Sequence, residues 1–356
     1  MLTPDGARRG DDAPLHVVAG DAVQHGRVRI IGLPGGPGGG PASGPGSGPG
    51  APQAALVVAS PESGTILWAP AGEPLPDLTL DALSGAGVDI AALALGPDGG
   101  ALARTLAALR RAGALSDGCD VVAVQIGHGT ASGPLSARLE AWGARLAPDD
   151  ARLGPAREPG EIADARRRPR RTLVLGAASS GKSAVAEALL AAEPDVDYLP
   201  TGAAPSAADP EWAARVDAHR RRRPPWWRTL EGAGPAETLA TPGSPVLLDS
   251  LGTWVSELLG RLGAWDDAPG WREAFEKEAD AVVRAWTRTG RRVVAVGEET
   301  GWGVVPGTPA GRRFRDALGT VNQRLAAESE QVLLVVAGRI VPLADGPGLP
   351  APEGAR

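Results

Sequence analysis

One eight-residue stretch combines the residue types and the spacing needed to bind a phosphate. It fits the G-x-x-x-x-G-K-[S/T] pattern of nucleoside triphosphate-binding loops, and it comprises Gly176, Ala177, Ala178, Ser179, Ser180, Gly181, Lys182 and Ser183. In such a loop, backbone N–H groups turn inward around phosphate oxygens, the lysine reaches the β- and γ-phosphates, and the final hydroxyl binds Mg²⁺. A Gly/Ser-rich turn that matches by chance is the alternative, so the flanking segments decide between the two.

The flanking segments are those that a phosphate-binding loop requires. Thr172–Leu175 leads into the loop as an apolar run typical of a buried strand, and 183–190 leaves it with apolar residues at helical spacing. This order places the start of a helix, with its partial positive charge, beside the phosphate. We therefore predict a nucleoside triphosphate site at this loop.

A carboxylate further along the chain completes the expected site. The apolar run Pro245–Ser250 predicts a strand that ends at Asp249. In nucleotide sites of this kind a strand-end carboxylate helps to hold Mg²⁺, directly or through water. Many strands of α/β proteins end in Asp, so this signal depends on the loop upstream. We predict that Ser183 and Asp249 together hold Mg²⁺.

The histidines do not form a metal-binding pattern. No two of them lie close enough in sequence to make a local pair, which argues against a multi-histidine metal centre; the four are His16, His25, His128 and His219. His128 follows a predicted strand, and a polar residue at a strand end is the favoured interpretation. His219 lies on a predicted helix over 211–222, on one face with Glu211 and Arg215. A solvated side chain is the ordinary interpretation of such a lone helical histidine.

Composition restricts the class of protein further. The chain has 356 residues and a formal net charge of −6, which gives no case for a nucleic-acid-binding or membrane-surface protein. Cys119 is the sole cysteine, so internal disulfides and a cysteine-rich zinc site are excluded. The sequence contains no run of about 20 apolar residues, and residues 1–6 lack a secretory signal pattern. We expect a cytoplasmic protein with no membrane segment.

The order of apolar segments and of Gly/Pro-rich stretches predicts two domains. We expect an N-terminal α/β domain over 1–148 with a flexible Gly/Pro-rich insert at about 33–52, a linker over 149–170, a second domain over 171–343 and a disordered tail over 344–356. The arginine-rich end of the linker is interpreted as a solvated connector rather than an anion site. In the second domain, strands alternate with helices, which predicts a mostly parallel sheet flanked by helices.

The individual elements follow from hydrophobic periodicity. In the N-terminal half the expected strands are 16–19, 28–31, 55–59, 65–68 and 120–126, and the expected helices are 102–112 and 135–146. In the C-terminal half the expected strands are 172–175, 197–199, 245–250, 292–296 and 331–336. The expected helices there are 183–190, 211–222, one through 254–259, 275–286 and 314–328.

Residues 171–343 resemble the bifunctional adenosylcobinamide kinase / adenosylcobinamide-phosphate guanylyltransferase family of cobalamin biosynthesis. The resemblance implies a P-loop (RecA-like) α/β fold for this half. It rests on the phosphate-binding loop and on the segments E-W-A-A-R-V-D-A-H at 211–219, R-P-P-W-W-R-T-L-E at 223–231, L-L-D-S-L-G-T-W at 247–254, E-T-G-W-G-V-V-P at 299–306 and F-R-D-A-L-G-T-V-N-Q-R-L-A at 314–326. The N-terminal half resembles the metallo-β-lactamase fold faintly. It lacks that family's H-x-H-x-D-H metal signature, so we expect a degenerate domain of unknown role.

The family resemblance implies two reactions and a set of site residues. Adenosylcobinamide is phosphorylated by ATP or GTP with Lys182 as a catalytic residue, and GMP then passes from GTP to the new phosphate through a covalent GMP–histidine at His219. The implied nucleotide contacts are the phosphate-binding loop, Pro200, Thr201, Gly202, Arg220, Arg221, Arg222, Arg223, Glu231 and Asp249. The implied partners are a corrinoid substrate and, in a homotrimer, neighbouring copies of the chain.

Several residues depart from the pattern of the family. Pro200 and Gly202 stand where Ala and Ser are common, Ser250 where Cys is usual, Gly252 where Thr is usual, and Glu257 and Glu298 where Asn is common. None of them removes the expected nucleophile or the loop. Two alternatives stay open: an enzyme that retains one of the two activities, and a non-catalytic GTP-binding regulatory protein.

Overall fold

The computed structural model describes the chain as two compact units. The described residues are 7–8, 14–15, 22–25, 27–34, 53–60, 64–70, 75–96, 99–124, 132–146, 168–202, 210, 214, 216–217, 220–221 and 223–343. Unit 1 comprises Met1–Arg168 and Ala191–Pro194, and unit 2 comprises Pro169–Leu190 and Asp195–Arg356. Most of the predicted insert, linker and helix 211–222, and the whole of the predicted tail, lie outside the described residues.

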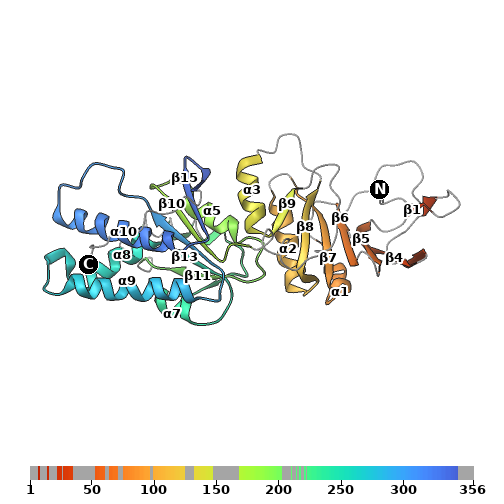
Figure 1. Ribbon diagram of the computed structural model, residues 1–356, viewed down its shortest axis with the longest axis horizontal. Helices are drawn as coiled ribbons and strands as arrows, with labels where there is room; N and C mark the ends of the chain where they lie inside the picture. The colour runs from red at the N-terminus through yellow and green to blue at the C-terminus, as the bar shows by residue number, and fades with distance from the viewer. Residues whose placement is uncertain are drawn as a thin grey trace. The chain divides into compact units, whose positions relative to one another are not determined.

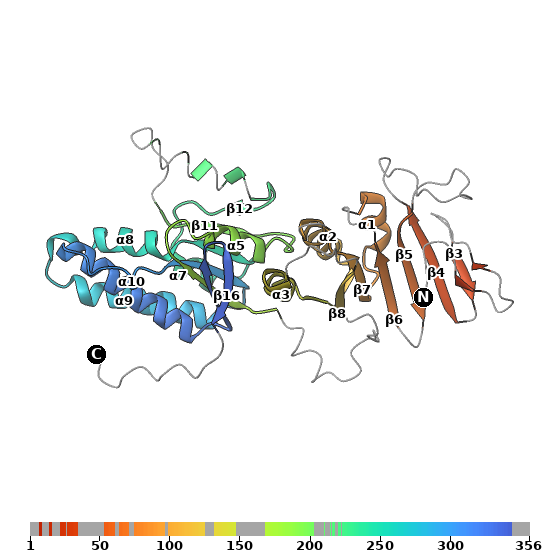
Figure 2. The same cartoon turned by 90° about the horizontal axis from the view of Figure 1, so that it is seen from above.

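Unit 1 contains a seven-stranded mixed sheet in the order β3-β4-β5-β6-β7-β8-β9 (Figure 2). Strands β3 to β6 pair antiparallel, and β6 to β9 pair parallel. The strands are β3 (Ala22–His25), β4 (Val28–Pro34), β5 (Gln53–Ser60), β6 (Gly64–Ala69), β7 (Val88–Ala94), β8 (Leu115–Val124) and β9 (Ala144–Leu146); the short pair β1 (Ala7–Arg8) and β2 (Pro14–Leu15) forms a separate ribbon. The helices are α1 (Asp77–Leu83), α2 (Gly100–Arg111) and α3 (Ser132–Ala141).

The sequence predicted part of unit 1 correctly. The antiparallel pair β5–β6 and helix α2 confirm the prediction, whereas α1 and β7 were not predicted. The predicted helix 135–146 is wrong at its end, because Gly143 adopts a left-handed φ of 68° and the next three residues join the sheet as β9 beside β8. Strand β7 is an Ala-rich apolar run without the alternation that marks a half-buried strand, since six of its seven residues are buried.

Unit 2 is built on a second seven-stranded sheet in the order β12-β11-β13-β14-β10-β15-β16. All of its pairs are parallel except β15–β16. The strands are β10 (Arg171–Gly176), β11 (Asp197–Pro200), β12 (Arg228–Thr229), β13 (Val246–Asp249), β14 (Val293–Glu298), β15 (Gln331–Val336) and β16 (Arg339–Leu343). The helices are α5 (Lys182–Leu189), α7 (Pro235–Ala240), α8 (Leu251–Arg261), η1 (Ala264–Asp266), α9 (Trp271–Arg288) and α10 (Pro309–Ala327). The expectation of a mostly parallel sheet flanked by helices is confirmed.

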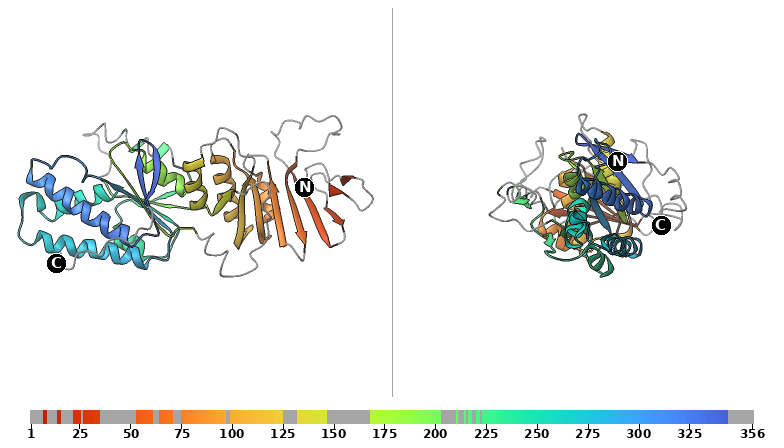
Figure 3. Two further views of the ribbon diagram at one scale, coloured as in Figure 1. Left: turned by 45° about the horizontal axis from the view of Figure 1, so that its top comes forward. Right: turned by 90° about the vertical axis from the view of Figure 1, so that its left-hand side faces the viewer.

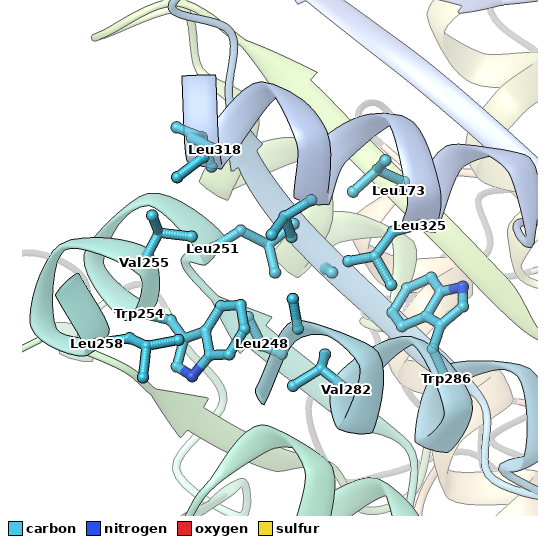
Figure 4. Packing of buried hydrophobic residues seen from close by; sticks show 14 of the residues in the cluster. Leu173, Leu248, Leu251, Trp254, Val255, Leu258, Val282, Trp286, Leu318 and Leu325 are labelled. Atoms are coloured by element: carbon cyan, nitrogen blue, oxygen red, sulfur yellow. The ribbon is translucent and has the colours of Figure 1, made fainter. Parts of the chain in front are cut away.

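Three helices of unit 2 pack against its sheet through one apolar core. Helices α8, α9 and α10 lie side by side (Figures 1 and 3). Figure 4 shows Leu248 and Leu173 from the sheet among Val255, Val282 and Leu318 from these helices. Each buried side chain of this kind contributes about 1.5–3 kcal/mol relative to leaving it exposed. This core holds the carboxyl ends of the parallel strands at one edge of the sheet.

The predicted strands of unit 2 are all present, but several boundaries differ. Helix α10 begins at Pro309 instead of 314, because Thr308 caps it by accepting a hydrogen bond from Gly311 N and proline suits the first turn. Helix α7 and strands β12 and β16 were not predicted. Strand β16 follows β15 through a two-residue turn at Ala337 and Gly338, both with positive φ, as a type I′ hairpin turn requires.

Within the described ranges, none of the helices has both the length and the apolar character needed to cross a bilayer.

Candidate active site

The phosphate-binding loop lies between strand β10 and helix α5, as the sequence predicted. A Cβ atom on Gly176 would lie 2.5 Å from the Ser180 Oγ and 2.8 Å from the carbonyl oxygen of Val335, so the tight start of the loop requires glycine. The Ser180 carbonyl accepts a hydrogen bond from Gly338 N across 2.9 Å. The loop is therefore held on β10 and against the turn between β15 and β16.

Two polar side chains of the loop have surroundings that fit a phosphate. Lys182 is 5% exposed, and its Nζ lies 3.3 Å from the carbonyl oxygen of Ala177 and 3.7 Å from Glu298 Oε1. The Ser180 Oγ is buried and has no hydrogen-bond partner among the described residues. A buried hydroxyl without a partner is costly, and a phosphate oxygen would satisfy it.

Asp249 reaches the loop from the end of β13. Its Oδ1 accepts a hydrogen bond from the Ser183 hydroxyl across 3.3 Å, although the two residues are 66 positions apart. Its Oδ2 accepts one from the Tyr198 hydroxyl across 3.2 Å. The structure thus brings together the two predicted magnesium ligands. Hydroxyl and carboxylate oxygens are ligands that Mg²⁺ prefers, and phosphate and water oxygens would complete its coordination shell. Ser183 and Asp249 therefore fit the ion.

Tyr198 and Arg223 form a stacked pair beside Asp249. The Arg223 guanidinium carbon lies 3.5 Å from the centroid of the Tyr198 ring. Burial, and next the negative charge of Asp249, raise the pKa of the Tyr198 phenol above its usual value, so the phenol stays protonated and donates. Burial lowers the pKa of the Arg223 guanidinium below its usual value.

The predicted residues 200–202 lie where β11 approaches the start of α8. Thr201 Oγ1 accepts a hydrogen bond from Ser250 N across 2.9 Å and lies 2.6 Å from Thr253 Oγ1. Pro200 is paired with Asp249 in the sheet register, and Gly202 follows as a half-buried residue. The side chain of Thr201 therefore ties two elements of the site together.

The predicted arginines lie in different surroundings. Arg220 NH2 is 3.2 Å from Glu231 Oε1, and both side chains are about half exposed. Arg221 is exposed, and Arg223 is buried against Tyr198. His219 and Arg222 lie outside the described residues. The structure thus brings Arg220 to Glu231, whereas Arg223 belongs to the surroundings of Asp249.

Sequence reasoning missed two side chains of this site. Tyr198 is the sole tyrosine of the chain and holds Asp249 from the neighbouring strand. Glu298 ends β14, which lies between β10 and β13, and faces Lys182. The signal for Glu298 was present, because a carboxylate at the end of an apolar strand is the pattern that identified Asp249.

Comparisons with known proteins address unit 2. Residues 172–343 match the family profile described as cobinamide kinase / cobinamide phosphate guanyltransferase. Two proteins named bifunctional adenosylcobalamin biosynthesis protein CobU, from Salmonella typhimurium and Escherichia coli, are 41% and 39% identical over 175 residues, which is 47% of this chain and 95% of each relative. The bifunctional adenosylcobalamin biosynthesis protein CobP of Pseudomonas aeruginosa is 37% identical over 183 residues, or 50% of this chain and 99% of that protein.

Proposed function

Through residues 172–343 the chain belongs to the cobinamide kinase / cobinamide phosphate guanyltransferase family, and we propose that the site around Lys182 and Asp249 serves both reactions. Unit 2 is an adenosylcobinamide kinase and adenosylcobinamide-phosphate guanylyltransferase of cobalamin biosynthesis. The first reaction moves the γ-phosphoryl group of a nucleoside triphosphate to a hydroxyl of adenosylcobinamide. The second joins GMP from GTP to that phosphate and releases pyrophosphate.

The hydrogen bond between Ser183 and Asp249 carries this proposal. It brings the hydroxyl of the phosphate-binding loop and the strand-end carboxylate to one point, beside the start of α5 that would face the phosphates. Ser183 and Asp249 would hold Mg²⁺, and the bound ion would neutralise charge on the triphosphate. Lys182 would bind the β- and γ-phosphates from the buried side of the loop. Since both reactions use a triphosphate, one loop suits both.

For GMP transfer we assign His219 as the nucleophile. A neutral imidazole nitrogen attacks the α-phosphorus of GTP, a P–N bond forms, and the bond to the leaving pyrophosphate breaks. A phosphate oxygen of adenosylcobinamide phosphate then attacks the same phosphorus, which frees the imidazole and forms adenosylcobinamide-GDP. The exposed Arg220 and Arg221, which follow His219 in the sequence, support a phosphate-binding role for this segment, since arginine offsets the charge of phosphate oxygens.

Labelling with α-³²P-GTP tests the assignment of His219. We expect acid-labile label on the wild-type protein, no label on His219→Ala, and normal label on the control His128→Ala. Equal labelling of wild type and His219→Ala would overturn the assignment. Separate assays of phosphorylation and of GMP transfer decide whether both activities are present, and binding of GTP without either turnover would favour a regulatory protein.

We also propose a homotrimer and a non-catalytic role for unit 1. Exposed apolar side chains after β14 support an interface between copies, because Trp302 is 74% and Val304 95% exposed. Light scattering that gives the mass of one chain would contradict the trimer. For unit 1, the strand pair β5–β6 followed by a helix and strand β8 supports the likeness to a degenerate metallo-β-lactamase fold.

A further inference from the structure

The carboxylate of Glu298 joins two parts of the triphosphate site. Its Oε1 lies 3.7 Å from the Lys182 Nζ, and its Oε2 accepts a hydrogen bond from Gly252 N across 2.8 Å at the start of α8. The side chain is 27% exposed, so solvent reaches the carboxylate while it faces Lys182. A negative charge therefore lies beside the ammonium group that a triphosphate would bind.

Glycine at position 252 leaves the space that the Glu298 carboxylate occupies. A Cβ atom there would lie 2.1 Å from Glu298 Oε2 and 2.8 Å from its carboxyl carbon. Glu298 and Gly252 are both departures from the residues usual in the family, and their contact gives one physical reason for the two departures. The Glu298 carboxylate fits here because Gly252, which faces it, has no side chain.

The backbone beneath Glu298 is fixed on several sides. In the sheet register Glu298 is paired with Gly176, the first residue of the loop. Its carbonyl oxygen accepts a hydrogen bond from Asn322 Nδ2 across 3.0 Å. The main chain is therefore held beside the loop, and the carboxylate stays within reach of Lys182.

We propose that Glu298 is a positioning residue that acts on the triphosphate through Lys182. Without nucleotide its carboxylate holds the ammonium group in the loop, and a bound triphosphate replaces the carboxylate as the partner of that group. Glu298 thereby weakens triphosphate binding while it keeps Lys182 in place. This inference rests on the proposed function, because it takes Lys182 as a phosphate ligand of both reactions.

The test measures binding of GTP and of ATP by titration calorimetry, which needs no turnover. Glu298→Gln removes the charge but keeps an oxygen that can accept from Gly252 N. We expect its dissociation constants to fall by about threefold to tenfold, since a partly exposed ion pair no longer competes. Glu257→Gln, the same change at an exposed position of α8, should leave them unchanged. Structural damage at the site cannot produce tighter binding, so unchanged or weaker binding by Glu298→Gln overturns the proposal.

A double-mutant cycle tests whether the effect passes through Lys182. In a Lys182→Ala background we expect Glu298→Gln to have no more than a small effect on triphosphate binding. If the tightening is as large there as in the wild type, Glu298 acts on the phosphates directly and the positioning role is wrong. If the wild type and Lys182→Ala bind GTP equally, the proposed function itself fails, which is a different result.

A stability measurement tests the contact with Gly252 without any ligand. Gly252→Ala should change the Tm less favourably in the wild type than in a Glu298→Ala background, because only in the wild type does the new methyl group displace the carboxylate from Gly252 N. In a Glu298→Ala background the same substitution should not lower the Tm, since alanine is the better helix former. Equal effects in the two backgrounds would contradict the contact in solution.

Discussion

The phenol of Tyr198 donates a hydrogen bond to Asp249 from the neighbouring strand, across 3.2 Å. Strands β11 and β13 are parallel and in register, with Tyr198 opposite Leu247. The second oxygen of Asp249 faces Ser183. Tyr198 therefore orients the carboxylate that we assign to Mg²⁺, although it carries no charge and belongs to no phosphate-binding motif.

Removal of the Tyr198 hydroxyl should weaken the use of Mg²⁺. Tyr198→Phe keeps the ring beneath Arg223 and removes the hydrogen bond to Asp249. A hydrogen bond to a charged group contributes about 1.5–3 kcal/mol, so we expect at least a tenfold rise in the Mg²⁺ concentration needed for half-maximal rate. The measurement is a Mg²⁺ titration of both reactions. An unchanged titration midpoint would show that Asp249 is oriented without Tyr198.

Loss of the Ser183 hydroxyl should impair both reactions together. Ser183→Ala removes the donor to Asp249 and the proposed metal ligand, so we expect kcat for phosphorylation and for GMP transfer to fall about tenfold to hundredfold. Ser256→Ala, at an exposed position of α8, is the matched control and should retain both rates. A loss confined to one reaction would mean that the two reactions use different metal sites.

The core between α9 and the sheet should carry much of the stability of unit 2. Trp286 is fully buried (Figure 4), and replacement of a buried aromatic by alanine costs about 3–5 kcal/mol. Trp286→Ala should lower the free energy of unfolding of unit 2 by this amount in urea. Lys277→Ala, at an exposed position of α9, is the control and should change stability by less than about 0.5 kcal/mol.

A buried carboxylate should make unit 2 sensitive to acid. Burial alone would raise the pKa of Asp197, but hydrogen bonds from Arg228 and Arg291 together hold the pKa below its usual value. A lowered folded-state pKa means that this stabilisation is present above the unfolded-state pKa and is lost as the pH falls through the folded-state value.

Asp197→Asn tests this acid sensitivity. We expect the substitution to destabilise unit 2 at pH 7, because two arginines lose their charged partner. The stability difference between wild type and variant should shrink as the pH is lowered towards 3. Urea unfolding at both pH values measures it, and a difference that is the same at pH 7 and pH 3 would contradict the role of Asp197.

Local signals were sufficient for the parts of the site that are continuous in sequence. The loop 176–183, its strand and its helix follow from glycine spacing and periodicity, because each of these features depends on residues a few positions apart. Asp249 was predicted because it ends an apolar strand. The early start of α10 also had a local signal, in the cap at Thr308.

The order of the strands could not be derived from such signals. No residue pattern within β14 indicates that this strand lies between β10 and β13. That place in the sheet is what puts Glu298 beside Lys182. Likewise, the register of β11 with β13 decides that Tyr198 reaches Asp249.

The sequence by itself thus determined which groups could bind a triphosphate and Mg²⁺: the loop with Lys182 and Ser183, and the carboxylate of Asp249. Only the tertiary structure decided which neighbours orient them. The physical reason is that parallel strands from distant parts of the chain end at the same edge of a sheet. The distances between Asp249 and Tyr198, and between Glu298 and Lys182, depend on how the whole sheet packs around the core of unit 2.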